Sequence, residues 1–140
     1  MVKHGDRQST IGSPALILFA HGARGAAWAE PLERLRAELQ RRQPLARVEI
    51  AYLELQSPDL AQALDALAAG GARSIHVVPV FWSRGAHIER DLVAIVQEFL
   101  SRTRGVAVRT LPVLADLPGM NEFLVSTIWN LAVPSPEKAP

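Results

Sequence analysis

Two histidines follow short apolar segments of this chain and stand close to glycines. His21 comes directly after the apolar run at 15–20 and is followed by Gly22, and His87 follows the apolar segment at 74–81 across a short loop. A neutral imidazole binds borderline divalent metals. Because its ordinary pKa is about 6.5, it also accepts a proton near neutral pH. These residue types therefore indicate a metal ligand or a general base at each position.

Further polar residues accompany the two histidines. Glu54 stands at the end of an apolar segment, where a carboxylate could assist proton transfer or hold a metal. Arg24 and Arg84 could bind the carboxylates of an acidic ligand through their forked donors, and Gly85 leaves room for a ligand near the backbone. Each residue also has a structural alternative, such as a turn, a helix cap or a solvated surface position, and the sequence leaves that choice open.

The other two histidines are not expected to belong to a site. His76 lies inside an apolar segment and is expected to be packed structure, and His4 lies in a polar N-terminal stretch. The candidate metal ligands and proton acceptors are therefore His21 and His87, with Glu54 as a helper.

Apolar runs alternate with amphipathic segments along the chain. Pro31 is tolerated only in the first turn of a helix, so the first helix is expected to begin near Glu30. The expected strands cover 15–20, 47–55, 74–81 and 106–114, and the expected helices cover 27–42, 59–69, 88–101 and 118–132.

This alternation predicts a single three-layer α/β domain over 14–132, with about four parallel strands and helices on both faces. The ends of the chain, 1–13 and 133–140, are polar or proline-rich and are expected to be flexible tails. Pro79 and Pro112 lie toward the carboxyl ends of their strands, where the hydrogen-bond ladder can already have ended.

The expected topology brings the two histidines together. In open α/β sheets, ligands bind beyond the carboxyl ends of the strands, at the point where the strand order reverses. With the common order 2-1-3-4, the first and third strands are neighbours across that point. His21 closes the first strand and His87 is expected in the loop after the third, so both imidazoles would face one crevice.

Composition excludes several other classes of function. The chain has 140 residues, 49% hydrophobic and 21% charged, with a net charge of +1, so charge gives no case for a nucleic-acid or membrane partner. It has no cysteine, which removes disulfides, thiolate metal sites and thiol nucleophiles and fits the cytoplasm. Neither a signal peptide nor a membrane-spanning run is found, so we expect a soluble, cytoplasmic protein.

Three segments together resemble the short sirohydrochlorin chelatases. LILFAHGARG resembles that family's first motif, in which an apolar strand runs into His-Gly and then arginine. ARVEIAYLELQSPDL resembles its second, with Leu-Glu near the strand end, and VVPVFWSRGAHIERDL resembles its third, with a glycine-containing loop before histidine. The similarity covers about residues 14–130, in order and without large gaps.

The resemblance implies a half-length chelatase domain that inserts a divalent metal into sirohydrochlorin, in the biosynthesis of cobalamin or another tetrapyrrole. Cobalt is the expected metal, and nickel or iron is inserted by relatives. The family's metal-handling histidines map onto His21 and His87. Arg24, Arg84 and Gly85 are then expected on the side of the acidic tetrapyrrole. The resemblance also implies a homodimer, with the metal as substrate and no organic cofactor.

Other readings remain open at this point. A metal or tetrapyrrole carrier of the same fold would need the same two histidines. A histidine phosphatase also places His-Gly after its first strand, but it needs an arginine immediately before the histidine, where this chain has Ala20. A protein with purely structural histidines would bind no divalent metal.

Overall fold

Strands and helices alternate along the chain, which we describe from a computed structural model that places residues 14–83, 85–133 and 135. The strands are β1 (Ala15–Ala20), β2 (Arg47–Tyr52), β3 (Ser74–Pro79) and β4 (Ala107–Thr110). The α-helices are α1 (Glu30–Arg42), α2 (Leu60–Ala69), α3 (Ala86–Arg102) and α4 (Met120–Ala132). Two short 3-10 helices, η1 (Ala26–Trp28) and η2 (Leu114–Asp116), precede α1 and α4.

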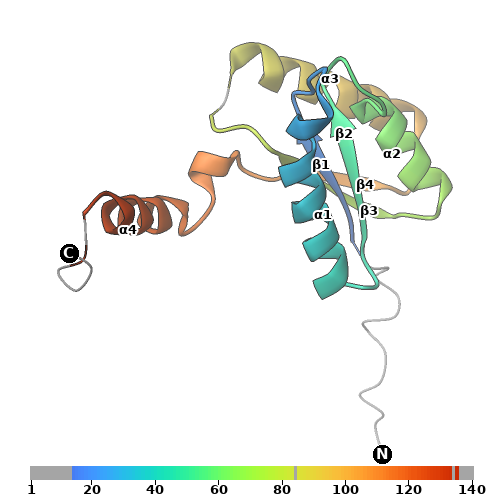
Figure 1. Cartoon of the computed structure of the whole chain (residues 1–140). Coiled ribbons are helices and arrows are strands. Elements are labelled where there is room, and N and C mark those ends of the chain that lie inside the picture. Colours follow the sequence, from blue (N-terminus) through green and yellow to red (C-terminus); the bar gives the residue numbers. More distant parts are fainter. Residues whose placement is uncertain (1–13, 84, 134, 136–140) are drawn as a thin grey trace, which may run out of the picture.

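The four strands form one parallel sheet in the order β2-β1-β3-β4 (Figure 1). Ala15 of β1 pairs with Arg47 on one side and with Ile75 on the other, and Ser74 of β3 pairs with Ala107. Parallel neighbours need crossover connections, which here carry the helices onto the faces of the sheet. The predicted α/β class, with four parallel strands and helices on both faces, is confirmed, and the assumed strand order is the one found.

Each face of the sheet has its own apolar core. The side chains of α2 and α3 lie in one core, where Ile17, Leu64 and Phe99 are almost completely buried. The other core lies under α1, where Leu32 packs with strand residues such as Leu18. Because side chains alternate along a strand, neighbouring residues of β1 enter different cores.

Local signals in the sequence account for where two helices begin. Pro31 lies in the first turn of α1, where its missing N–H group is not needed. The Asp59 carboxylate accepts a hydrogen bond from the Gln62 backbone N–H at 2.8 Å, and the Gln62 side chain accepts one from the Asp59 N–H at 2.9 Å. This reciprocal pair satisfies donors that the first turn of α2 would otherwise leave free.

Three strands are shorter than the sequence predicts. β2 ends at Tyr52 because the chain turns there: the Tyr52 N–H donates to the Pro58 carbonyl at 2.9 Å, and Leu55 takes the left-handed φ of 66°. β3 ends at Pro79 rather than at residue 81. β4 ends at Thr110, shortly before Pro112, which has no amide hydrogen to donate to a ladder.

The start of α3 corrects the expected position of His87. The prediction placed this residue in the loop after the third strand, but it is the second residue of α3. Gly85 is the extended N-cap of the helix, and its carbonyl accepts a hydrogen bond from the Glu89 N–H at 3.0 Å, which closes the first turn. The imidazole of His87 therefore projects from the first helical turn.

α4 stands away from the sheet and from the other helices, and η2 connects it to them (Figure 1). None of its residues is buried. Phe123, Ile128 and Trp129 each expose 60% or more of their surface, which is unusual for such large apolar side chains on one helix.

The expected tails at 1–13 and 133–140 fall outside the described residues, except for Val133 and Ser135. Within the described ranges, no helix combines the length and the apolar character needed to cross a bilayer.

Candidate functional site

The candidate site lies at the carboxyl edge of the sheet, where β1 is followed by a connection to one side and β3 by a connection to the other. His21 is the first residue after β1, and its side chain is 52% exposed. Gly22 follows with φ of +92°, and a Cβ atom at this position would overlap the carbonyl oxygen of Glu54. Glycine is therefore required here, because the turn after His21 passes directly against the turn after β2.

His21 and Glu54 are in contact at this edge. The Nδ1 atom of His21 lies 3.6 Å from Oε1 of Glu54, and the Glu54 backbone N–H donates to the His21 carbonyl at 3.2 Å. Both side chains are more than half exposed, so water screens their interaction. The carboxylate can thus orient the imidazole while Nε2 stays available, which suits a ligand or a proton acceptor.

Glu54 does not end the second strand, as the sequence predicted, but lies two residues beyond β2. It still reaches the same edge because the Leu53 N–H donates to the Ala20 carbonyl at 2.9 Å, and this bond continues the pairing with the first strand past Tyr52.

An apolar cavity of about 730 Å³ opens beside His21. Its size lies within the range of roughly 300–1,000 Å³ that is usual for small-molecule sites. One wall comes from η1 and the start of α1, with Trp28 and Leu32, and another from Phe81 and Trp82 after β3. The imidazole of His21 is the group with acid–base and metal-binding chemistry in this lining, which otherwise consists mainly of aromatic and aliphatic residues.

Aromatic packing fixes the floor of the cavity. The ring of Phe81 lies 5.6 Å from that of Phe19 in an edge-to-face arrangement and 6.4 Å from the imidazole of His21. Tyr52 also lines the cavity and is buried; burial, together with the nearby charge of Glu33, raises the pKa of its hydroxyl. The phenol of this lining residue therefore stays protonated at neutral pH.

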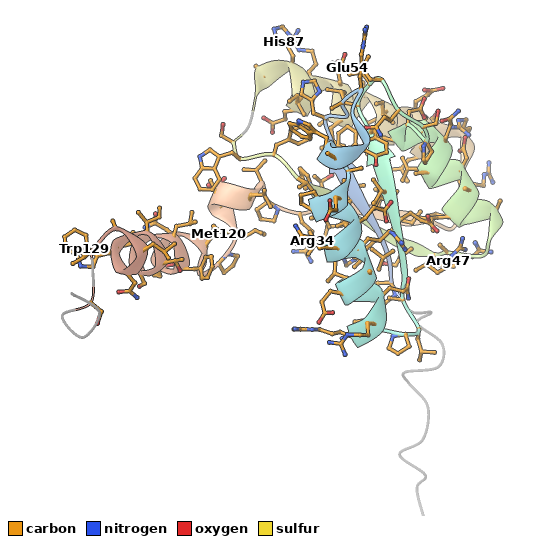
Figure 2. The ribbon with its side chains drawn as sticks, in the orientation of Figure 1. Arg34, Arg47, Glu54, His87, Met120 and Trp129 are labelled. Carbon is orange, nitrogen blue, oxygen red and sulfur yellow. The ribbon has the colours of Figure 1, made fainter. Side chains whose placement is uncertain are left out.

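His87 lies at the same end of the molecule as Glu54, whereas Arg34 and Arg47 lie away from that end (Figure 2). It is exposed at the start of α3 and does not line the cavity. The structure therefore brings His21 and Glu54 into contact and places His87 at the same end of the molecule but outside the cavity lining. The expectation that both imidazoles face one crevice is thus not met by the cavity of a single copy.

The residues expected on the ligand side are spread over two loops. Arg24 is exposed in the turn before η1. Gly85 borders a smaller cavity of about 160 Å³ between Phe81 and the first turns of α3, on the other side of the loop. Arg84 lies outside the described residues.

One copy offers few metal ligands. Among the described residues, no three His, Asp or Glu side chains gather closely enough to hold a metal ion.

Sequence reasoning missed the aromatic lining of the cavity. Trp28, Tyr52, Phe81 and Trp82 come from three separate segments, each within a few residues of the end of β2 or β3 or the start of α1. Their common position at the carboxyl edge was the signal that could have identified them.

The fold and the site together define a doubly wound parallel α/β protein with a small-molecule cavity at its topological switch point and a histidine in the wall of that cavity. The sequence profile of the CbiX family matches residues 15–130. The chain belongs to the CbiX family.

Known relatives agree with this assignment. The sirohydrochlorin cobaltochelatase of Methanocaldococcus jannaschii is 37% identical over 78 residues, which cover 56% of this chain and 54% of that protein. The chain thus spans about half the length of the relatives it matches. The crystal structure of a CbiX protein from Marinobacter aquaeolei VT8 superposes with a TM-score of 0.71 at 26% identity, over 85% of this chain and 97% of that one.

A longer solved chain shares the fold. SirB from Bacillus subtilis, solved with Fe3+, superposes with a TM-score of 0.71 at 21% identity. The match covers 87% of this chain but 48% of SirB, so a unit of this size accounts for about half of that longer protein.

Proposed function

We propose that this protein inserts a divalent metal ion, cobalt in the first place and nickel or iron as alternatives, into sirohydrochlorin during cobalamin biosynthesis. The observation that carries the proposal is the apolar cavity at the switch point with His21 in its wall. Membership of the CbiX family and the name of the Methanocaldococcus relative support the choice of reaction and favour a catalyst over a carrier.

The cavity suits a flat tetrapyrrole. The aromatic faces for the macrocycle come from Trp28, Phe81 and Trp82. Arg24 is exposed three residues after His21, and its guanidinium group offers two parallel donors to a carboxylate of the macrocycle. Because most of the lining is apolar, binding would remove water from the ring nitrogens before the metal arrives.

The chemistry assigns a role to each polar residue. Insertion of a divalent cation into the macrocycle releases two N–H protons, which need acceptors. His21 delivers the metal or takes a proton through Nε2, while Glu54 orients the ring through Nδ1. His87 is the second metal ligand and proton acceptor at the same edge. No organic cofactor is needed, since no electrons are transferred.

We further propose that the protein acts in the cytoplasm as a homodimer. Two observations support the dimer: one copy presents an incomplete set of metal ligands, and the longer SirB fold contains about twice the matched length. The absence of cysteine fits a reducing compartment.

The test mixes purified protein with sirohydrochlorin and excess Co2+, Ni2+ or Fe2+ in turn and follows the absorbance spectrum of the macrocycle. We expect many turnovers per protein with at least one metal. Saturation after one equivalent would show a carrier instead, and no metal-dependent spectral change above the uncatalysed rate would reject the proposal.

Histidine variants locate the activity within the protein. His21→Ala and His87→Ala are each expected to abolish insertion while circular dichroism stays unchanged. His4→Ala, which removes a histidine outside the proposed site, is the matched control and should insert metal at the wild-type rate. Wild-type rates in His87→Ala would remove that residue from the mechanism.

A further inference from the structure

The face of the sheet that carries α1 is covered over only half its width. Over β1 and β2, Leu18 and Val48 are almost completely buried beneath α1. On β3 the side chains alternate: Ile75 and Val77 are fully buried on the α2–α3 face, whereas Val78, which points to the α1 face, is half-buried.

We call the remaining half the open strip. It consists of Val78 and Val80, which pack at the edge of the core under α1 and are only partly buried, and of the exposed Ala107 and Arg109 of β4. Ala107 and Arg109 pair with Ser74 and His76 and therefore lie on the α1 face, and both are exposed. In a doubly wound sheet a helix normally covers each half of each face. The helix available for this half is α4, but η2 carries it away from the sheet (Figure 1).

α4 has the apolar face that such a position needs. Val125, Ile128, Trp129 and Ala132 recur at the spacing of one helical face, and the first three are each at least 60% exposed. Its one charged residue is acidic, Glu122, whereas the charged residue of the open strip is Arg109. The helix therefore offers apolar side chains to Val78, Val80 and Ala107 and a carboxylate to Arg109, while Ser74 and His76 complete this face of β3.

We propose that α4 of one copy docks on the open strip of a second copy, beside α1, and that the second copy returns the same contact. This inference rests on the homodimer proposed above and states how it forms. A reciprocal exchange closes after two copies, so it gives a dimer rather than a fibre.

The size of the contact is sufficient for a stable dimer. Trp129, Val125 and Ile128 are exposed on the docking face of α4, and an aromatic side chain alone buries about 150–250 Å². Two exchanged helices, counted with the surface that they cover, therefore reach the roughly 1,200–2,000 Å² of a stable interface.

The exchange also reaches the candidate site. Pro31 and Leu35 of α1 and Val80 beside β3 line the cavity, so a helix seated between α1 and β4 would form a further wall of it. In addition, η2 is bonded to the loop of the cavity: the Leu114 N–H donates to the Phe81 carbonyl at 2.9 Å, and the Ala115 N–H donates to the Trp82 carbonyl at 3.0 Å. The base of the exchanged arm is thus hydrogen-bonded to the aromatic wall of the cavity.

Disulfide trapping tests the exchange directly, because the chain has no cysteine of its own. Val125→Cys on α4 and Ala107→Cys on the open strip are prepared as two separate proteins, mixed, allowed to exchange subunits and oxidised. We expect a covalent dimer that forms only in the mixture. Ala66→Cys, an exposed position on α2, replaces Ala107→Cys in the control and should give no cross-link.

Three results would overturn the inference. A double Ala107→Cys/Val125→Cys protein that oxidises to a cross-linked monomer would show that α4 folds back on its own copy. Cross-linking of Val125→Cys with itself alone would show that the two α4 helices pair with each other. The absence of a cross-link in the mixture, although the wild type is dimeric, would place the interface elsewhere.

Sedimentation measurements separate this inference from the proposed function. Ile128→Asp should raise the dimer dissociation constant at least about tenfold, because it puts a carboxylate into an apolar contact. Ser126→Asp, on the polar side of α4, should leave the constant unchanged. A dimeric Ile128→Asp protein would contradict the exchange alone, whereas a monomeric wild type would contradict the homodimer itself; neither result decides whether metal is inserted.

Discussion

Glu54 contacts His21 in two ways, through a backbone hydrogen bond and through the side chains. Its N–H donates to the His21 carbonyl at 3.2 Å, and its Oε1 lies 3.6 Å from the His21 Nδ1 atom. The backbone bond belongs to the continued pairing of the two chain segments, so it holds the two backbones close enough for the side chains to meet. The fold of the sheet edge therefore brings the imidazole and the carboxylate together.

Removal of the Glu54 charge should weaken the reaction without altering the fold. Glu54→Gln keeps the backbone bond and the shape of the side chain but loses the carboxylate that orients His21. We expect metal insertion to slow by about 10- to 100-fold, the usual effect of losing a group that supports a metal ligand. Steady-state rates with sirohydrochlorin measure the loss, and Glu49→Gln, an exposed position on β2, is the control. An unchanged rate would show that Glu54 has no part in the reaction.

Substitution of Gly22 should damage both stability and the site. In Gly22→Ala the new Cβ overlaps the Glu54 carbonyl oxygen, and the backbone keeps a φ of +92°, which alanine rarely adopts. We therefore expect a loss of about 1–3 kcal/mol in the free energy of unfolding. Urea denaturation measures this loss. Gly25→Ala is the matched control, because a Cβ at Gly25 meets no atom within 4 Å. Equal stability of the two variants would contradict the close approach of the two turns.

The ion pairs of α1 predict a small dependence of stability on pH. Arg41 and Arg42 hydrogen-bond the Glu38 carboxylate and lower its pKa from 4.5 to about 2. A carboxylate whose pKa is lower in the folded state stabilises the fold above its ordinary pKa, and the contribution disappears as the pH falls toward 2.

Glu38→Gln should therefore lower the melting temperature slightly at pH 7 and much less near pH 2, with a smaller effect in high salt because the ion pairs lie at the surface of α1. Thermal melts of both proteins across this pH range provide the measurement. A difference that grows on acidification would show that the arginines do not stabilise the carboxylate.

Much of the fold could be predicted because each element carries its own signal. The apolar run before His21 and the proline at the start of α1 marked β1 and α1 within a few residues. The ends of β2 and β4 were less predictable, because Leu53, Val113 and Leu114 are apolar without belonging to a strand. Their burial depends on tertiary contacts that periodicity does not reveal.

The candidate site was predicted in part. The carboxyl-edge rule placed His21 and Glu54 correctly at one edge, and the structure adds that they are in contact. The cavity was not predictable, because its lining combines α1 with segments after β1, β2 and β3 that meet only in the folded chain. The position of α4 was also not predictable, because an apolar stripe shows that a helix needs a partner but not where that partner lies.

The hydrogen bonds from η2 to Phe81 and Trp82 tie the pocket to the arm that leaves the sheet. Suppose that a bound ligand favours one position of the loop at Phe81 and Trp82, and with it one position of α4. Thermodynamic linkage then requires that α4, when held in this position, raises the affinity for the ligand by the same factor. Dimerisation and substrate binding would then be thermodynamically coupled, and dilution of the protein alone would weaken both.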